Sequence, residues 1–309
     1  MPKQTSSEGR IQVDQFALYY NITIMLVTRP LLTTILASFA VLFATVARAE
    51  TPAVLVSVKP LHAIVSAVMA GGDPPRLLVK GGASPHDYAM RPSDAAALND
   101  ADLIVWIGES FELFLAKPLQ ALAGNVKAIR LMDLAGEGDD PHLWLDPDNA
   151  RKIAERVTDA LIILDPDNGD RYRSNSIAFA ARLDLLDASL RATLAPVTDK
   201  PYLVFHDAYG AFERRYGLTR LAAITINPQR KPGAKRIVAL RDLISESGAG
   251  CLFAEPQFTP ALLATLIEGS AARIGQLDPL GASLPPGPEA YFTLMIGLAE
   301  NLRACLMTD

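Results

Sequence analysis

The feature of this chain that most constrains its fold is the alternation of short apolar runs with longer amphipathic segments. Short apolar runs between turn residues are typical of strands, and apolar residues that recur every three or four positions are typical of helices. Strands that alternate with helices pair in parallel, because each helix carries the chain back to the starting edge of the sheet. The predicted strands are 54–58, 76–79, 101–108, 128–131, 202–205, 221–226, 251–254 and 273–277. The predicted helices are 63–70, 92–98, 111–122, 150–164, 171–194, 208–216, 234–247, 260–269 and 290–305.

The predicted helix 171–194 differs from the others in its length. At about 1.5 Å per residue it would span roughly 36 Å, enough to cross a small domain. Its apolar residues recur in steps of three and four, which indicates one packed stripe. They are Phe179, Leu183, Leu186, Leu190 and Leu194. We predict an α/β protein with two lobes, each with a mostly parallel sheet flanked by helices: an N-terminal lobe over 50–166, a linking helix over 167–195 and a C-terminal lobe over 196–309.

Residues 1–49 predict an export signal. The stretch 30–47 is uncharged and apolar, and Ala47-Arg48-Ala49 supplies the cleavage pattern of a Sec-type signal peptide. A membrane-spanning helix is the alternative, but the stretch is shorter than the roughly 20 apolar residues that spanning needs. Residues 1–24 lie far upstream for a signal peptide, so we expect Met25 to be the true initiator. With no cysteine near the cleavage site, we expect an exported, soluble protein without a lipid anchor.

Composition excludes several classes of protein. Half of the 309 residues are hydrophobic and a fifth are charged, which predicts packed domains and argues against disorder. The net charge of −5, without a basic run, argues against nucleic-acid binding. Two cysteines are too few for a disulfide-rich scaffold or a zinc site made mainly of thiolates.

Three of the four histidines, His86, His142 and His206, follow segments expected to end at the carboxyl edge of a sheet. Ligands bind at that edge in open α/β sheets, and three imidazoles there would suit a divalent cation such as Zn²⁺. Zinc needs a fourth ligand, for which the candidates are water and Asp278, just after the predicted strand 273–277. From the residues alone, an ordinary hydrogen-bonded histidine remains the alternative at each position.

The sequence segments around these histidines and two further segments resemble those of a known protein family. The segments are HDYAMRPSD at 86–94, PHLWLDP at 141–147, FHDAYGAFE at 205–213, FAEPQF at 253–258 and LDPLG at 277–281. In this order they resemble the periplasmic zinc-binding proteins of ABC importers, the ZnuA-type members of the metal-specific solute-binding family. The resemblance covers about residues 54–305.

This resemblance implies two α/β lobes joined by one rigid helix, with the metal buried in the cleft between them. It implies a high-affinity periplasmic receptor that delivers Zn²⁺, its transported ligand, to the membrane permease of an ABC importer with its ATPase. We expect a monomer that performs no enzymatic reaction and binds no nucleic acid.

The resemblance also assigns the metal ligands. His86 and His142 would come from the N-terminal lobe and His206 from the C-terminal lobe, with Asp278 or water as the fourth ligand. Manganese-binding relatives carry glutamate in place of the third histidine, so His206 favours zinc. The chain departs from some zinc relatives in having Pro85 where they have glutamate. It also has the short segment 135–140 where many have a histidine-rich loop, which predicts no strong auxiliary metal site.

Further residues are expected near the site. Asp207 and Glu255 would orient ligand histidines, although each could instead cap a local turn or line a wall. His62 is expected to be structural or to support the site, and not to be a ligand. Trp144 and Tyr209 adjoin ligands and would shield the metal, unless they are simply core residues.

Cys251 and Cys305 match the positions of a disulfide in the relatives. An oxidising periplasm favours such a pairing, with two free thiols as the alternative.

Two other functions remain as alternatives. A manganese receptor of the same family would prefer a carboxylate at the position of His206. A secreted zinc hydrolase also holds zinc with three histidines and an open position, but the chain contains no His-Glu-x-x-His motif.

Overall fold

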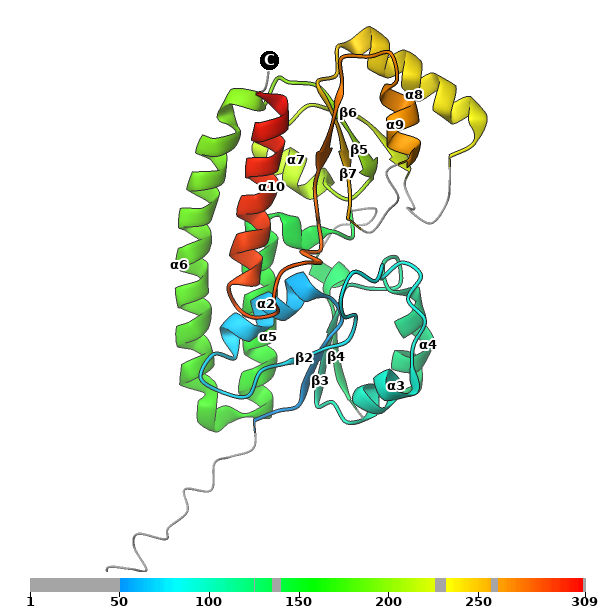
Figure 1. Ribbon diagram of the computed structural model, residues 1–309. Coiled ribbons are helices and arrows are strands. Elements are labelled where there is room, and N and C mark those ends of the chain that lie inside the picture. The colour runs from blue at the N-terminus through cyan, green and yellow to red at the C-terminus, as the bar shows by residue number, and fades with distance from the viewer. Residues whose placement is uncertain (1–50, 125, 135–139, 226–231, 257–260, 308–309) are drawn as a thin grey trace, which may run out of the picture. The chain divides into compact units, whose positions relative to one another are not determined.

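Two four-stranded sheets form the framework of the structure, a computed structural model that describes residues 51–124, 126–134, 140–225, 232–256 and 261–307 (Figure 1). The first sheet has the order β2-β1-β3-β4 and the second β6-β5-β7-β8. All the strand pairs in these two sheets are parallel, as predicted. The strands are β1 Val54–Val56, β2 Arg76–Leu77, β3 Leu103–Trp106, β4 Lys127–Arg130, β5 Tyr202–His206, β6 Arg220–Thr225, β7 Cys251–Ala254 and β8 Arg273–Gln276.

Both sheets have the same topology. In each, the chain builds one edge first and then crosses to the other side of its first strand, so the strand order reverses between β1 and β3 and again between β5 and β7. Such a reversal opens a crevice at the carboxyl ends of the strands, where α/β proteins bind ligands. His206 is the last residue of β5 and therefore lies at this edge.

Helices connect the strands and cover the sheets. They are α2 Lys59–Val68, α3 Pro92–Asn99, α4 Leu113–Ala121, α5 Pro147–Leu164, α6 Gly169–Leu194, α7 Gly210–Tyr216, α8 Ala234–Ser247, α9 Ala261–Ile267 and α10 Ala290–Leu306. The 3₁₀ turns are η1 Leu131–Leu134, η2 Leu143–Leu145, η3 Pro166–Asn168 and η4 Ala195–Val197. No helix in the described ranges has both the length and the apolarity needed to cross a membrane.

The long helix α6 has 26 residues and lies between the two sets of strands in the sequence. All five residues of the predicted stripe are buried, whereas Arg173, Asp184 and Arg191 are exposed. The stripe packs against α5 and α10, which run alongside α6 in Figure 1. One buried apolar cluster includes side chains of both sheets and of α6.

Residues 51 onward belong to one compact unit, so the expected lobe boundaries at 166 and 195 stay predictions.

Several element boundaries differ from the sequence predictions. The helix expected at 63–70 begins at Lys59, because Pro60 in its first turn has a fixed backbone angle that suits a helix start. The strand expected over 101–108 is confined to 103–106, because from Ile107 onward the chain turns into a loop. The signal peptide expected over 1–49 lies outside the described residues, as do the end of strand 221–226 and the start of helix 260–269.

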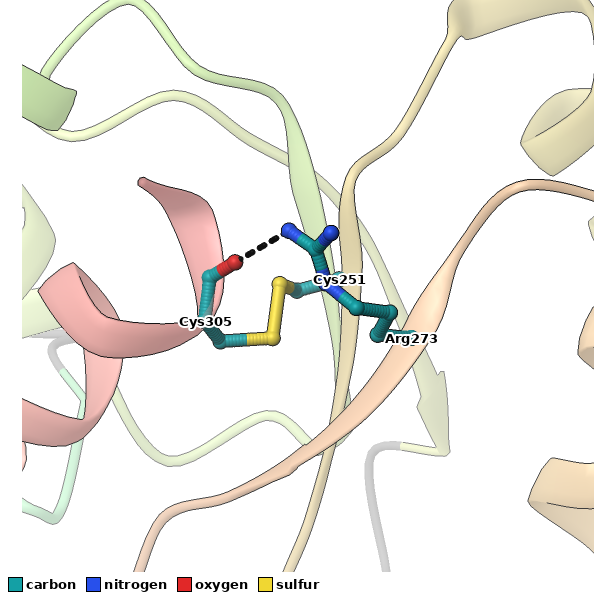
Figure 2. Close-up of a disulfide and its surroundings, with 3 residues drawn as sticks. All are labelled: Cys251, Arg273 and Cys305. Atoms are coloured by element: carbon teal, nitrogen blue, oxygen red, sulfur yellow. Dashed lines mark hydrogen bonds between the residues drawn. A yellow bond between two sulfur atoms is a disulfide. The ribbon is translucent and has the colours of Figure 1, made fainter. Parts of the chain in front are cut away.

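The predicted disulfide is present and is shown in Figure 2. It joins Cys251, the first residue of β7, to Cys305 near the end of α10. The guanidinium of Arg273 on β8 donates a hydrogen bond of 2.6 Å to the carbonyl oxygen of Cys305. The last helix is therefore fastened to the second sheet by a covalent bond and a charge-assisted hydrogen bond.

Candidate metal centre

Three histidines from separate parts of the chain meet at one point. His86 follows β2, His142 directly precedes η2, and His206 ends β5. Ligand nitrogens of the three rings, one from each, lie within 4.8 Å of one another. The ring centroids are 5.0 Å apart for His142 and His206, 5.1 Å for His86 and His206 and 5.8 Å for His86 and His142. Within the described ranges, these side chains form the group that has the arrangement of a metal site.

The ring of His142 is oriented by Asp140. Its Nδ1 lies 2.7 Å from Oδ1 of Asp140, and the same oxygen accepts a 2.9 Å hydrogen bond from the backbone N–H of His142. Burial raises the pKa of Asp140, but its hydrogen bonds with His142 outweigh this effect and lower the pKa below its usual value. The charged carboxylate can only accept, so Nδ1 is the nitrogen that donates to Asp140, and Nε2 is the ring nitrogen left outside this bond.

His206 has a carboxylate neighbour, Glu255. Its Nδ1 lies 3.2 Å from Oε1 of Glu255, and both side chains are almost fully buried. Neither ring nitrogen of His206 has a partner with hydrogen-bond geometry in the part of the chain that the structure describes. The hydroxyl of Tyr209 donates a 3.2 Å hydrogen bond to the same oxygen of Glu255. Buried ring nitrogens without partners are costly, and a bound cation would satisfy the one nitrogen of the ring that carries the lone pair.

His86 also has a buried ring nitrogen, Nε2, that lacks a partner among the described residues. Burial, assisted by the neighbouring His142 and His206, lowers the pKa of His86 to about 3 against an opposing effect of Asp140. His86 is therefore neutral at physiological pH, the form in which imidazole binds metals.

Phe111 packs against two of the candidate ligands, although it is not among the site residues predicted from the sequence. Its ring makes edge contacts with His86 and His142, at centroid distances of 4.8 Å and 5.0 Å, and it is 2% exposed. It follows β3 by five residues, so the rule that strand ends carry site residues would have found it. The adjacent Glu112 is fully buried, and burial raises the pKa of its carboxyl group to about 7.

Asp278 lies outside the histidine cluster. Its Oδ1 accepts a 3.1 Å hydrogen bond from the backbone N–H of Leu280, and its Oδ2 accepts a 2.6 Å bond from that of Ala282. The carboxylate thus organises the loop after β8. Each oxygen keeps a lone pair beyond the backbone bond that it accepts, and the role of Asp278 as fourth ligand stays a prediction.

This loop is also held from the other end of the sequence. The ammonium group of Lys59, at the start of α2, donates hydrogen bonds of 2.8, 2.6 and 2.9 Å to the carbonyl oxygens of Gly281, Ala282 and Leu284. The indole N–H of Trp144 donates a 2.9 Å bond to the carbonyl of Pro279. The loop therefore rests against elements of the first half of the chain.

Trp144 is fully buried beside the cluster, and its ring centroid lies 5.3 Å from that of His142. It is thus a core residue that also flanks the histidine cluster, so both expected roles remain open. His62 lies apart from the cluster, since its Nε2 lies 2.9 Å from the carbonyl oxygen of Pro75 and its Nδ1 3.4 Å from the hydroxyl of Ser66. Asp207 pairs with Arg220. Its carboxylate is therefore engaged by a guanidinium group and, among the described residues, is not found against the ring of a candidate ligand histidine.

The donor set fits a borderline-soft divalent cation. Zinc binds neutral imidazole nitrogen at about 2.0–2.1 Å, which places the nitrogens of a tetrahedral site about 3.4 Å apart. Inward movements of the rings on the order of 1 Å would bring these nitrogens to that spacing. The arrangement can therefore bind a metal with three protein ligands and a fourth position for a carboxylate or water.

Comparison with protein families gives a match over almost the whole described chain. The family profile described as ZnuA, zinc-uptake complex component A, periplasmic, matches residues 54–305. The high-affinity zinc uptake system protein ZnuA of Brucella abortus (strain 2308) is 39% identical over 308 residues, covering 83% of this chain and 92% of that protein. The protein of the same name from Yersinia pestis is 36% identical and covers 86% of this chain and 95% of its own length.

Solved structures agree in fold. A crystal structure of ZnuA superposes with a TM-score of 0.74 at 28% identity, covering 83% of this chain and 99% of that one. The periplasmic zinc-binding protein TroA from Treponema pallidum has a TM-score of 0.75, covering 84% of this chain and all of its own. Its identity is 21%, so this likeness concerns the fold alone.

Proposed function

Because the chain belongs to the ZnuA family of periplasmic zinc-uptake components, we propose that it is a high-affinity receptor that binds Zn²⁺ through His86, His142 and His206. It delivers the ion to the membrane permease of an ABC importer, whose ATPase drives uptake. Its work is binding and release, without covalent chemistry. Zinc is its cargo and not a resident cofactor.

The observation that carries this proposal is the meeting of three imidazoles from three distant segments, with ligand nitrogens within 4.8 Å of one another. Buried histidines whose ring nitrogens lack partners are unfavourable in a metal-free core, and they become favourable when they bind a cation. Three imidazoles suit zinc, whereas hard cations such as Mn²⁺ prefer carboxylate oxygen. The fourth position belongs to water or to Asp278.

The proposal is tested by metal content and by competition titration. Protein purified without chelator should contain about one zinc per chain by mass spectrometry, since the cluster holds one ion. Titration with zinc and manganese should show preference for zinc. His206→Ala should weaken zinc binding by more than the roughly 10- to 100-fold that loss of a residue supporting a ligand costs.

His62→Ala is the matched control, because His62 is a buried histidine with its own local partners outside the cluster. It should bind zinc as tightly as the unaltered protein. Preference for manganese, or equal zinc affinity with and without His206, would show that the proposed ligands or cargo are wrong.

A further inference from the structure

The carboxylate of Asp140 is shared between the two halves of the metal centre. Its Oδ1 accepts from the ring Nδ1 and the backbone N–H of His142. Its Oδ2 accepts a 3.0 Å hydrogen bond from the backbone N–H of Gly210, the first residue of α7. Gly210 lies four residues after His206, so one carboxylate joins the ring of one proposed ligand to the segment that follows another.

Asp140 is not itself placed as a ligand. It lies outside the cluster of ligand atoms, and each of its oxygens already accepts a hydrogen bond. Its side chain is only 12% exposed, so water competes little for these bonds. A buried carboxylate whose two oxygens both accept hydrogen bonds acts as a bracket: it holds the groups that donate those bonds at a fixed distance from each other.

The backbone at Gly210 is adapted to this bracket. A Cβ atom at that position would lie 3.0 Å from Oδ2 of Asp140 and 3.3 Å from a guanidinium nitrogen of Arg214, closer than side-chain carbons normally approach. Glycine is therefore the residue that lets α7 begin directly against the carboxylate.

We propose that Asp140 is a positioning residue with two tasks: it holds His142 as the Nδ1–H tautomer, and it fixes the distance from His142 to the start of α7 and hence to His206. The inference rests on the proposed function in that both histidines are taken as ligands. A carboxylate that orients a ligating imidazole sets which nitrogen meets the metal. Here the same carboxylate also connects His142 to the segment after β5, which carries the other proposed ligand, His206.

The first task is tested in the metal-free protein by long-range ¹H–¹⁵N correlation spectra after ¹⁵N-histidine labelling. The chain has four histidines, so His142 is assigned by the signals missing from His142→Gln. His142 should show a protonated Nδ1 and an unprotonated Nε2. In Asp140→Ala the Nε2–H tautomer should become substantially populated, a change that a merely structural role would not produce.

The second task is tested by zinc titration. Asp140→Ala should bind zinc about 10- to 100-fold more weakly. Asp140→Asn offers a single acceptor oxygen, so it should keep the His142 tautomer, lose the bond from Gly210 and bind zinc with an intermediate affinity. Gly210→Ala should also weaken binding, whereas Gly297→Ala, where a Cβ meets nothing within 4 Å, should leave it unchanged. Asp170→Ala, at a fully exposed aspartate, is the matched control for loss of charge.

The proposal is overturned if Asp140→Ala retains the Nδ1–H tautomer and binds zinc within about threefold of the unaltered protein, well short of the cost of losing an orienting partner. If Asp140→Ala does not fold, Asp140→Asn and Gly210→Ala decide, and unaltered zinc affinity in both overturns it. Failure of the unaltered protein to bind zinc would reject the proposed function instead, and the tautomer spectra would still decide the role of Asp140.

Discussion

The disulfide between Cys251 and Cys305 is predicted to supply a large part of the stability of this protein. The bond closes a loop with a sequence separation of 54. In the chain-entropy treatment, a loop of that length restricts the unfolded chain by about 14 cal/mol/K, or about 4 kcal/mol at 25 °C. Globular proteins of ordinary size have only about 5–15 kcal/mol of net stability, so reduction should remove between about a quarter and about four fifths of it.

Urea unfolding of the metal-free protein, followed by circular dichroism, measures this contribution. Oxidised and reduced forms of the unaltered protein contain the same side chains, so their difference isolates the cross-link. With a slope of about 3 kcal/mol/M, reduction should lower the urea midpoint by more than about 1 M. The slope should also rise, because the unfolded chain without its cross-link exposes more surface.

A double variant, Cys251→Ala with Cys305→Ala, provides the control for the reductant. Its midpoint should lie at or below that of the reduced protein, since Cys251 is fully buried and its truncation also removes packing contacts. The reductant should not change it. Midpoints of the oxidised and reduced proteins within about 0.3 M of each other would refute the argument, because the loop-closure cost would then be absent.

Two further predictions concern buried charged groups. The carboxyl group of Glu112 has a pKa of about 7 in the folded protein, against a usual value of 4.5. As pH rises, the unfolded chain therefore releases this proton before the folded protein does. The folded state consequently loses stability between about pH 4.5 and pH 7. Glu112→Gln should therefore gain about 2–3 kcal/mol relative to the unaltered protein between pH 5 and pH 8 in urea titrations of the metal-free protein, and a constant difference would contradict the assignment. Lys59→Met leaves three carbonyl oxygens of the loop 281–284 without their donor and should lower the unfolding free energy by about 2–3 kcal/mol. The exposed Lys80→Met should change it by less than about 0.5 kcal/mol, and equal effects of the two substitutions would argue against the buried contact.

The fold was largely predictable because its signals are local. The spacing of apolar residues within a window of about ten residues predicts each strand and helix. Parallel pairing then follows from the alternation of strands with helices. Boundaries were less predictable: Pro60 reads as a turn residue, yet it lies in the first turn of α2. Propensity describes a residue's preference, whereas the start of a helix also depends on what its first turn packs against.

The site was predictable in part for a different reason. The strand-end rule placed each histidine at a carboxyl edge, but His86 follows β2 of the first sheet and His206 ends β5 of the second, so the rule alone does not bring them together. Their assignment as one ligand set came from the resemblance. Contacts that depend on the folded chain were not visible. Lys59 lies 222 residues from the first carbonyl oxygen that it binds, so no local pattern connects the two residues. Asp140, in a short acidic segment, reads as a solvated loop residue.

The two sheets contribute side chains to one buried apolar cluster, and this affects how such a receptor captures and releases its cargo. One apolar cluster contains side chains of both sheets and of α6, so opening the molecule widely would expose buried surface at about 25 cal/mol per Å². Ring movements on the order of 1 Å at the three histidines expose no such surface. Capture should therefore cost little reorganisation, because carboxylates already flank two of the rings. Little reorganisation favours tight binding. A site that is tight for this reason should release its ion slowly on its own, because differences in affinity are expressed mostly in the dissociation rate.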